Sequence, residues 1–415
     1  MSLTGWPDAP GLGPPDGLVD RLASVGDRLA ETTAAVGRPL RLDPLAVLTE
    51  RAALVGLSRG GTVSCGRGTR LLAARDGWLA VSLARADDLD LVPAWLGPGG
   101  ELDTPSAVAG AAVPLDDAAW DVVARRVAVR SVADLEAQAV VLGLPVGVLA
   151  SPAVAAALAS PTGSGPFLDL PVSATSLGPA PARRLDGLLV VDLSSLWAGP
   201  LCGRILADAG ATVVKVESIS RPDGARLGPA AFFDLLNAGK ASVRVDLGHP
   251  AGVRSLVDLL GRADLVIEGS RPRALEQLGI RADALVEAGP AVWVSITGHG
   301  RHGPGRNRVA FGDDAAIAGG LAAWRDGRPC FCADAVADPA TGLVAAAAAL
   351  TALAAGGRWL VDVAMVDVAA HLAGPTLDAG DARPVAPPRP ADRGRARPSG
   401  ADDARFLAPA EIARP

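Results

Sequence analysis

The residues best placed to do chemistry in this sequence follow two apolar runs in its second half. The first run, residues 188–193, leads into a turn at residues 192–198, and the second, residues 212–216, leads into residues 217–224. A segment with helical spacing at about residues 201–209 separates the runs, which predicts a strand, a helix and a second, parallel strand. In such sheets ligands bind just beyond the carboxyl ends of the strands. We therefore expect ligand-binding groups in both turns.

Several common kinds of site are missing from these turns. The first turn reads DLSSLWAGPLCG and lacks the G-x-G-x-x-G spacing that lets a backbone approach a dinucleotide pyrophosphate. The chain also has no G-x-x-x-x-G-K-[ST] loop and no G-x-S-x-G elbow. Cys330 and Cys332 are one residue apart and have no neighbouring ligands, so we expect no metal site.

Composition restricts the class of protein further. The 415 residues carry a formal net charge of −6 and a pI near 5.3, which gives no basic surface for nucleic acid. The mean hydropathy of +0.30 comes largely from alanine, and no apolar run approaches the roughly 18 residues of a membrane span. Four scattered cysteines and the lack of a signal peptide predict a cytoplasmic protein without disulfides.

The elements that must position the turns are arranged in two units. Residues 1–150 read as a small α+β domain with N-terminal helices and a hairpin near residues 69–83, and residues 151–182 as a linker. Residues 183–374 alternate strand and helix, as in a Rossmann-like open parallel sheet. Residues 375–415 are rich in Pro and Arg and are expected to be disordered. The predicted fold class is α/β, with a smaller α+β domain.

A series of segments lies between residue 186 and about residue 370. They are DLSSLWAGPLCGRILADAGATVVKVES, RPDGARLG, FFDLLNAGKASVRVDL, ADLVIEGSRPRALEQLGI, VWVSITGHGRHGP, and ADPATGLVAAAAALTAL followed by GRWLVDVAM. The series resembles the large domain of the family III CoA-transferases in order and spacing, a family that includes formyl-CoA transferase and, as a relative, α-methylacyl-CoA racemase. Residues 65–83 and 131–152 resemble the family's small domain, which here precedes the large one. The chain is therefore similar to a permuted or fused family member.

The resemblance assigns a nucleophile. The family uses an aspartate that attacks an acyl-CoA and accepts CoA as a thioester, and the matching residue is Asp338. The residues alone also fit a second role, because Asp followed by Pro339 at the start of an Ala-rich helix is typical of a helix cap. Asp334 is the alternative nucleophile. Asp313 and Asp314 are expected to cap the next helix upstream.

The resemblance also implies which residues bind CoA, whose phosphates call for basic partners. They lie after the first strand, in the Asn-x-x-Lys motif and in the Arg-Pro motif. The predicted set is Leu196, Trp197, Ala198, Lys215, Arg221, Asn237, Lys240, Arg271 and Arg273.

The function implied is transfer of CoA from an acyl-CoA to a small carboxylic acid through a covalent intermediate on Asp338. Acyl-CoA is then a substrate, and no permanently bound cofactor is expected. Two alternatives stay open: an acyl-CoA racemase or isomerase, and a non-catalytic CoA-binding homologue. The racemase relatives carry a histidine near Asp313 that this chain lacks, which favours transfer. The family also implies a homodimer.

Overall fold

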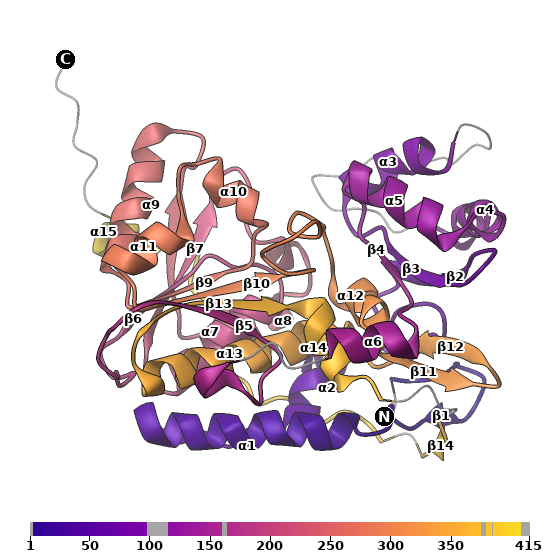
Figure 1. Ribbon diagram of the computed structural model, residues 1–415, viewed down its shortest axis with the longest axis horizontal. Coiled ribbons are helices and arrows are strands. Elements are labelled where there is room, and N and C mark those ends of the chain that lie inside the picture. Colours follow the sequence, from indigo (N-terminus) through magenta and orange to yellow (C-terminus); the bar gives the residue numbers. More distant parts are fainter. Residues whose placement is uncertain (1–2, 98–114, 160–163, 375–378, 384, 408–415) are drawn as a thin grey trace.

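A seven-stranded sheet forms the centre of the molecule (Figure 1). The computed structural model describes residues 3–97, 115–159, 164–374, 379–383 and 385–407. The strand order is β5-β13-β10-β9-β6-β7-β8, and all neighbours are parallel except β5, which pairs antiparallel with β13. The strands are β5 (Ser173–Gly178), β6 (Leu189–Asp192), β7 (Thr212–Ser218), β8 (Ala241–Val245), β9 (Leu265–Glu268), β10 (Val292–Thr297) and β13 (Arg358–Ala364).

The order of the strands reverses between β6 and β9, because β7 and β8 extend the sheet on one side and β10 and β13 on the other. This confirms the predicted open, doubly wound α/β fold. The turn after β6 lies at this reversal, where ligands bind in such folds, and the turn after β7 lies next to it.

Helices cover both faces of the large sheet (Figure 1). One core packs α7, α13 and α1 against residues such as Val190 and Val294, and the other packs α9 and α11 against residues such as Val191 and Trp293. Neighbouring residues of each strand thus point into different cores, which explains the unbroken apolar runs. These helices are α1 (Leu18–Val36), α7 (Ala198–Asp208), α9 (Pro250–Arg262), α11 (Ala282–Ala288) and α13 (Ala337–Ala355).

Helix α13 is the central helix of the fold. By length and composition it is the one described helix that could cross a membrane, but 89% of its apolar window is buried inside the protein. Its small side chains allow close packing, and a Cβ at Gly342 would lie 2.7 Å from the carbonyl oxygen of Ala198 on α7. The start of α13 is therefore held next to the turn that follows β6.

Shorter elements complete the large unit. They are α8 (Ala230–Asn237), α10 (Pro272–Glu276), α12 (Gly312–Ala318), α14 (Met365–Leu372), the hairpin β11 (Ala322–Arg325) and β12 (Arg328–Phe331), the pair β1 (Gly11–Leu12) and β14 (Asp381–Ala382), α6 (Pro152–Leu158), and two 3₁₀ turns at Gly165–Phe167 and Gly224–Leu227.

A separate three-stranded antiparallel sheet forms the small unit, residues 69–148. It contains β2 (Thr69–Ala73), β3 (Trp78–Ser82) and β4 (Val146–Val148), with α3 (Ala86–Leu96), α4 (Asp117–Ala128) and α5 (Val132–Leu142). The hairpin expected near residues 69–83 is present, with Ala73 opposite Trp78. One face of the hairpin packs on the helices of the small unit. The opposite face packs on α12 of the large unit, where Leu71 and Ala80 meet Ile317.

Two of the expected boundaries are wrong. The N-terminal helices α1 and α2 (Pro44–Val55) pack into the core of the large unit and not into the small unit, because their apolar faces meet α13. Residues 151–182 are not a plain linker, since β5 adds an edge strand to the large sheet. Half of the residues of β5 are exposed, so the strand shows no apolar run by which to recognise it.

The C-terminal segment is also more ordered than expected. Residues 385–407 lie along the large unit and end in α15 (Asp403–Phe406), while residues 408–415 fall outside the described residues. Asp402 and Asp403 accept hydrogen bonds from the backbone N–H groups of Ser242 and Arg244 on the edge strand β8, at 2.9 and 2.8 Å. These polar contacts with a sheet edge hold a segment that has almost no apolar pattern.

Candidate active site

Asp338 lies in the first turn of α13, where α12 and the turn before α13 meet. Its side chain is half-buried, and its carboxylate accepts a hydrogen bond from the backbone N–H of Gly312. A Cβ at Gly312 would lie 2.5 Å from Oδ2 of Asp338 and 2.4 Å from the carbonyl oxygen of Ala335. Only glycine therefore allows this approach, which orients the carboxylate.

The turn before α13 is strained. Ala333 and Ala335 have φ values of 58° and 43°, in the left-handed region that residues with a Cβ avoid. The backbone N–H of Ala335 donates to Asp313 at 3.1 Å, and that of Ala333 donates to Oγ1 of Thr4 at 3.1 Å. Side chains distant in sequence thus hold the backbone that leads into Asp338.

Arg51 of α2 reaches this turn and binds Asp334 with two hydrogen bonds, at 2.8 Å from Nε and 2.5 Å from Nη2. The Asp334 carboxylate is fully buried. The Arg51 guanidinium also lies over the ring of Trp197, 4.9 Å from its centroid, and 5.7 Å from that of Phe232. Asp334 is therefore held in an ion pair, which favours Asp338 over Asp334 as the free carboxylate.

Two carboxyls of this cluster, those of Asp338 and Asp313, have raised pKa values. Burial raises the pKa of Asp338 to about 7, opposed by Arg51 and reinforced by Asp313 and Asp334. Burial, followed by the charge of Asp334, raises the pKa of Asp313 to about 6. At neutral pH a large share of Asp338 is ionised, while its proton affinity stays high. Such a carboxyl can act as a nucleophile or exchange a proton.

A chain of hydroxyl groups joins Asp313 to Asp314 through the small unit. Thr69 hydrogen bonds to Asp313, Thr69 and Ser82 are 2.9 Å apart, and Ser82 is 2.6 Å from Asp314. The two hydroxyl groups carry only two hydrogens for the three contacts of this chain, so a third hydrogen bond requires a proton on one of the two carboxyls. Burial raises the pKa of Asp314 to about 7, which suits Asp314 to hold that proton. Asp314 also accepts from the backbone N–H of Phe311 at 3.0 Å, in agreement with the predicted helix cap.

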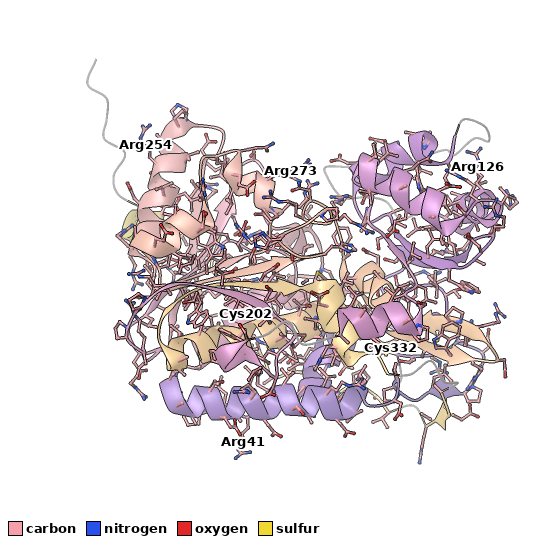
Figure 2. All side chains as sticks on the ribbon, viewed as in Figure 1. Arg41, Arg126, Cys202, Arg254, Arg273 and Cys332 are labelled. Atoms are coloured by element: carbon pink, nitrogen blue, oxygen red, sulfur yellow. The ribbon has the colours of Figure 1, made fainter. Side chains whose placement is uncertain are left out.

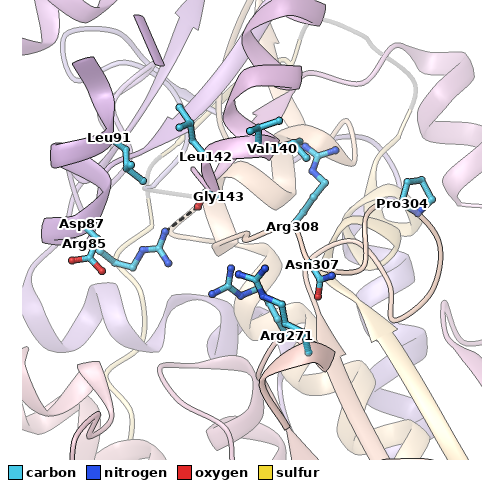
Figure 3. Close-up of a pocket in the computed structure, with 12 residues that line it drawn as sticks. Arg85, Asp87, Leu91, Val140, Leu142, Gly143, Arg271, Pro304, Asn307 and Arg308 are labelled. Carbon is cyan, nitrogen blue, oxygen red and sulfur yellow. Dashed lines mark hydrogen bonds between the residues drawn. The ribbon is translucent and has the colours of Figure 1, made fainter. Parts of the chain in front are cut away.

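A basic cavity of about 320 Å³ lies between the small unit and the large unit (Figure 3). Arg85 comes from the small unit and Arg308 from the loop before α12. Arg271 immediately precedes α10, and Arg273 lies in its first turn. Burial and the charges of Arg273, Arg85 and Arg221 lower the pKa of Arg271. Arg85 is paired with Asp88, and Arg308 with Glu136 at 2.7 Å. Among the described residues no carboxylate forms an ion pair with Arg271 or Arg273, so these two cavity arginines are suited to an anion.

Two predicted lysines lie elsewhere, inside the protein. Lys215 and Lys240 are 2% exposed. Lys215 pairs with Asp223 at 2.8 Å and donates to the carbonyl oxygen of Ser194, while Lys240 pairs with Asp192 at 2.9 Å. Their ammonium groups are held by protein partners, so a contact with ligand stays a prediction that this structure does not favour.

The rest of the predicted set divides by exposure. Asn237 is buried and accepts from Lys240 at 3.1 Å, and Trp197 and Ala198 are buried against α8 and α13. Leu196 is 40% exposed with φ 70°, and its backbone N–H donates to Asp223. Arg221 is exposed at the same edge and lies near enough to Arg271 to lower its pKa. Leu196, Arg221, Arg271 and Arg273 therefore remain open to a ligand.

The sequence reasoning missed four residues, three of them from the first part of the chain. Arg51, Thr69 and Arg85, and Arg308 from the loop before α12, were not selected, although each contacts the carboxylates or lines the cavity. Arg51 and Asp334 are 283 positions apart, and no local spacing signals such a pair. In the described part of the chain, no three His, Cys, Asp or Glu side chains are grouped so as to hold a metal ion.

The model of the family "CoA-transferase family III" matches residues 185–401. The "Probable fatty acyl-CoA transferase Rv3272" of Mycobacterium tuberculosis is 35% identical over 208 residues, which cover 46% of this chain and 53% of that protein. The "Succinyl-CoA--D-citramalate CoA-transferase" of Chloroflexus aurantiacus is 33% identical, over 42% of this chain and 46% of that protein.

A crystal structure of the Mycobacterium tuberculosis protein aligns with a TM-score of 0.43 at 35% identity, over 46% of this chain and 57% of that one. The chain thus spans about half the length of the curated relatives that it matches.

Proposed function

The chain belongs to CoA-transferase family III, and from this membership we propose that it moves CoA from an acyl-CoA to a carboxylic acid through a covalent intermediate on Asp338. The observation that carries the proposal is the setting of Asp338. It is a half-buried carboxylate, oriented by the N–H of Gly312, while the neighbouring Asp334 is occupied by Arg51.

The proposed steps need no external proton. An oxygen of ionised Asp338 attacks the thioester carbonyl, the C–S bond breaks, and CoA leaves as a thiolate from a mixed anhydride. The thiolate then attacks the aspartyl carbonyl, which releases the donor acid as a carboxylate and leaves an aspartyl-CoA thioester. The acceptor carboxylate attacks this thioester and expels the thiolate. The thiolate finally attacks the acceptor's acyl carbonyl, which frees Asp338.

The N–H of Gly312 would also steady the charge that develops on the Asp338 carboxyl during each attack. The role of Arg51 and Asp313 in this proposal is to set how much of Asp338 is ionised. Because Asp338 is half-buried, the nucleophile can be shielded from water once substrate covers it, which would protect the anhydride from hydrolysis.

The basic cavity supports CoA as the substrate. Arg271 and Arg273 would bind the phosphates, while Leu91 and residues 140–142 give the cavity an apolar side for the rest of the CoA molecule. Of the nine residues predicted to bind CoA, the proposal retains Leu196, Arg221, Arg271 and Arg273.

One observation favours a second candidate, an acyl-CoA racemase. The charge of Asp313 is close enough to Asp338 to raise its pKa, so the two carboxyls could act together to exchange a proton with the α-carbon of a bound acyl-CoA. This gives the racemase alternative a partner residue that the sequence did not identify.

The proposal also includes a homodimer and a cytoplasmic location. Both derive from the resemblance and composition alone. Light scattering of the purified chain would give the mass of the assembly directly.

The test is the intact mass of the protein after mixing with a panel of short and branched acyl-CoAs, with and without hydroxylamine. A mass gain equal to CoA, removed by hydroxylamine and absent from Asp338→Ala, is expected. The exposed Asp169→Ala serves as the control and should form the adduct. No adduct, combined with uptake of deuterium at the α-carbon, would favour the racemase. CoA binding with neither reaction would favour a non-catalytic homologue.

A further inference from the structure

The strained turn at residues 333–335 is held almost entirely by the first 69 residues of the chain. Thr4 accepts from the N–H of Ala333, and Cys65 donates to its carbonyl oxygen at 3.3 Å. Arg51 binds Asp334, and Thr69 hydrogen bonds to Asp313, which in turn accepts from Ala335. These contacts hold a backbone conformation that costs free energy at two alanines.

Arg51 is the one cation in this set, and its own position is well defined. It lies on α2, one residue after Glu50, which accepts from the buried Arg204 of α7 at 2.8 Å. Its guanidinium lies against the rings of Trp197 and Phe232 and uses both Nε and Nη2 on Asp334. A planar fork is needed for this pair of bonds, and a lysine could not reproduce it.

We propose that Arg51 is a positioning residue for Asp338: through Asp334 it fixes the strained turn before the nucleophile, and its charge acts directly on the nucleophile's carboxylate. The inference rests on the proposed function for the identity of the nucleophile. It also means that the N-terminal segment of a chain completes the active site of that same chain.

The charges around Asp338 give this role a direction. The groups that face Asp338 are Arg51 from α2, Asp313 from α12 and Asp334 from the turn, and the thiol of Cys65 lies beside the same cluster. Arg51 lowers the pKa of Asp338, whereas Asp334 and Asp313 raise it. Loss of Arg51 must therefore raise this pKa, and loss of the Asp334 charge must lower it, although both changes break the same ion pair.

The experiment compares Arg51→Met, Arg51→Lys and Asp334→Asn with the wild type. The rate of CoA-adduct formation is measured from pH 5 to pH 9, and the Asp338 carboxyl is titrated by NMR in protein labelled with ¹³C-aspartate. Asp338→Asn assigns the signal. The matched control is Arg28→Met, which breaks the exposed ion pair between Arg28 on α1 and Asp169.

Arg51→Met should move the midpoint of the Asp338 titration, and with it that of the pH–rate profile, up by about one pH unit. Asp334→Asn should move both midpoints down by a similar amount. Arg51→Lys should restore the midpoint but react about tenfold more slowly at pH 9, because the turn loses its second hydrogen bond. Arg28→Met should match the wild type. Shifts in the same direction for Arg51→Met and Asp334→Asn, or no shift in either, would overturn the proposal.

The two proposals fail separately. If the wild type forms no adduct with any acyl-CoA, the proposed function fails. The NMR titration still decides the role of Arg51, because opposite shifts support it and parallel or absent shifts refute it.

Discussion

Asp192 and Lys240 form a fully buried ion pair, 2.9 Å long, at the carboxyl edge of the large sheet. Lys240 also donates to the carbonyl oxygen of Pro200 at 2.8 Å and to Asn237 at 3.1 Å, so all three of its N–H groups are used. Burial opposes ionisation of Asp192, but Lys240 and Lys215 hold its pKa below the usual range. The pair fixes the start of α7 next to the strand end.

Replacing Lys240 tests whether this residue supports the fold or binds the ligand. Lys240→Met leaves Asp192 charged and buried without its partner, which should cost about 3 kcal/mol in the free energy of unfolding. Urea unfolding measures the change, and Asp192→Asn in the same chain should recover part of it. The exposed Arg254→Met is the control (Figure 2). Unchanged stability with weaker CoA binding would instead restore Lys240 to the ligand site.

The basic cavity predicts a dependence of CoA binding on charge. Arg271→Met or Arg273→Met should weaken CoA binding about tenfold at low salt, because each removes a charge-assisted hydrogen bond to phosphate. The difference from wild type should shrink as salt rises. Calorimetric titration with CoA and with dephospho-CoA measures both effects. Arg254→Met, on the far side of α9 from Arg273 in Figure 2, should bind normally. Equal losses in all three variants would indicate general charge steering and not a site.

The sequence alone was sufficient to predict the strands that are buried on both faces of the sheet. Runs such as residues 188–193 and 212–216 predicted β6 and β7 because a parallel sheet covered by helices requires unbroken apolar strands. The β2–β3 hairpin was equally readable from its turn at residues 75–77. In contrast, β5 and the segment at residues 385–407 are held by backbone and carboxylate contacts that leave no apolar period.

The candidate site was predicted only in part, and for a physical reason. Asp338 and Arg271 stand in recognisable local motifs, so their positions could be assigned. Whether a lysine such as Lys215 faces solvent or a buried aspartate depends on packing between distant elements. The pairing of Arg51 with Asp334 arises in the same way, from the packing of α2 near the N-terminal end of α13. Long-range contacts of this kind leave no trace in local spacing.

The C-terminal segment predicts a local effect on the edge of the sheet. Phe406 is 8% exposed and packs into the core beside β8. Phe406→Ala should cost about 2 kcal/mol and should speed hydrogen exchange at the amides of Ser242 and Arg244, which lose their carboxylate partners as the segment loosens. Val385→Ala, at a 70% exposed position of the same segment, is the control. Unchanged exchange at these two amides would show that the segment does not protect the edge strand.

Asp338→Asn predicts a gain in stability that depends on pH. The pKa of Asp338 is raised by burial to about 7, above the value near 3.9 of an unfolded aspartate. The folded chain therefore binds more protons between these values, and its stability falls as the pH rises from about 4 to 7. Asparagine has no such loss. The melting temperature of Asp338→Asn should exceed that of wild type by about 2 °C or more at pH 8, and the difference should shrink toward zero near pH 4.

Asp169→Asn, at an exposed position, should show no such trend. A gain of equal size at pH 4 and pH 8 would mean that the stabilisation does not come from the carboxyl proton, and that Asp338 is not poised to ionise near neutral pH.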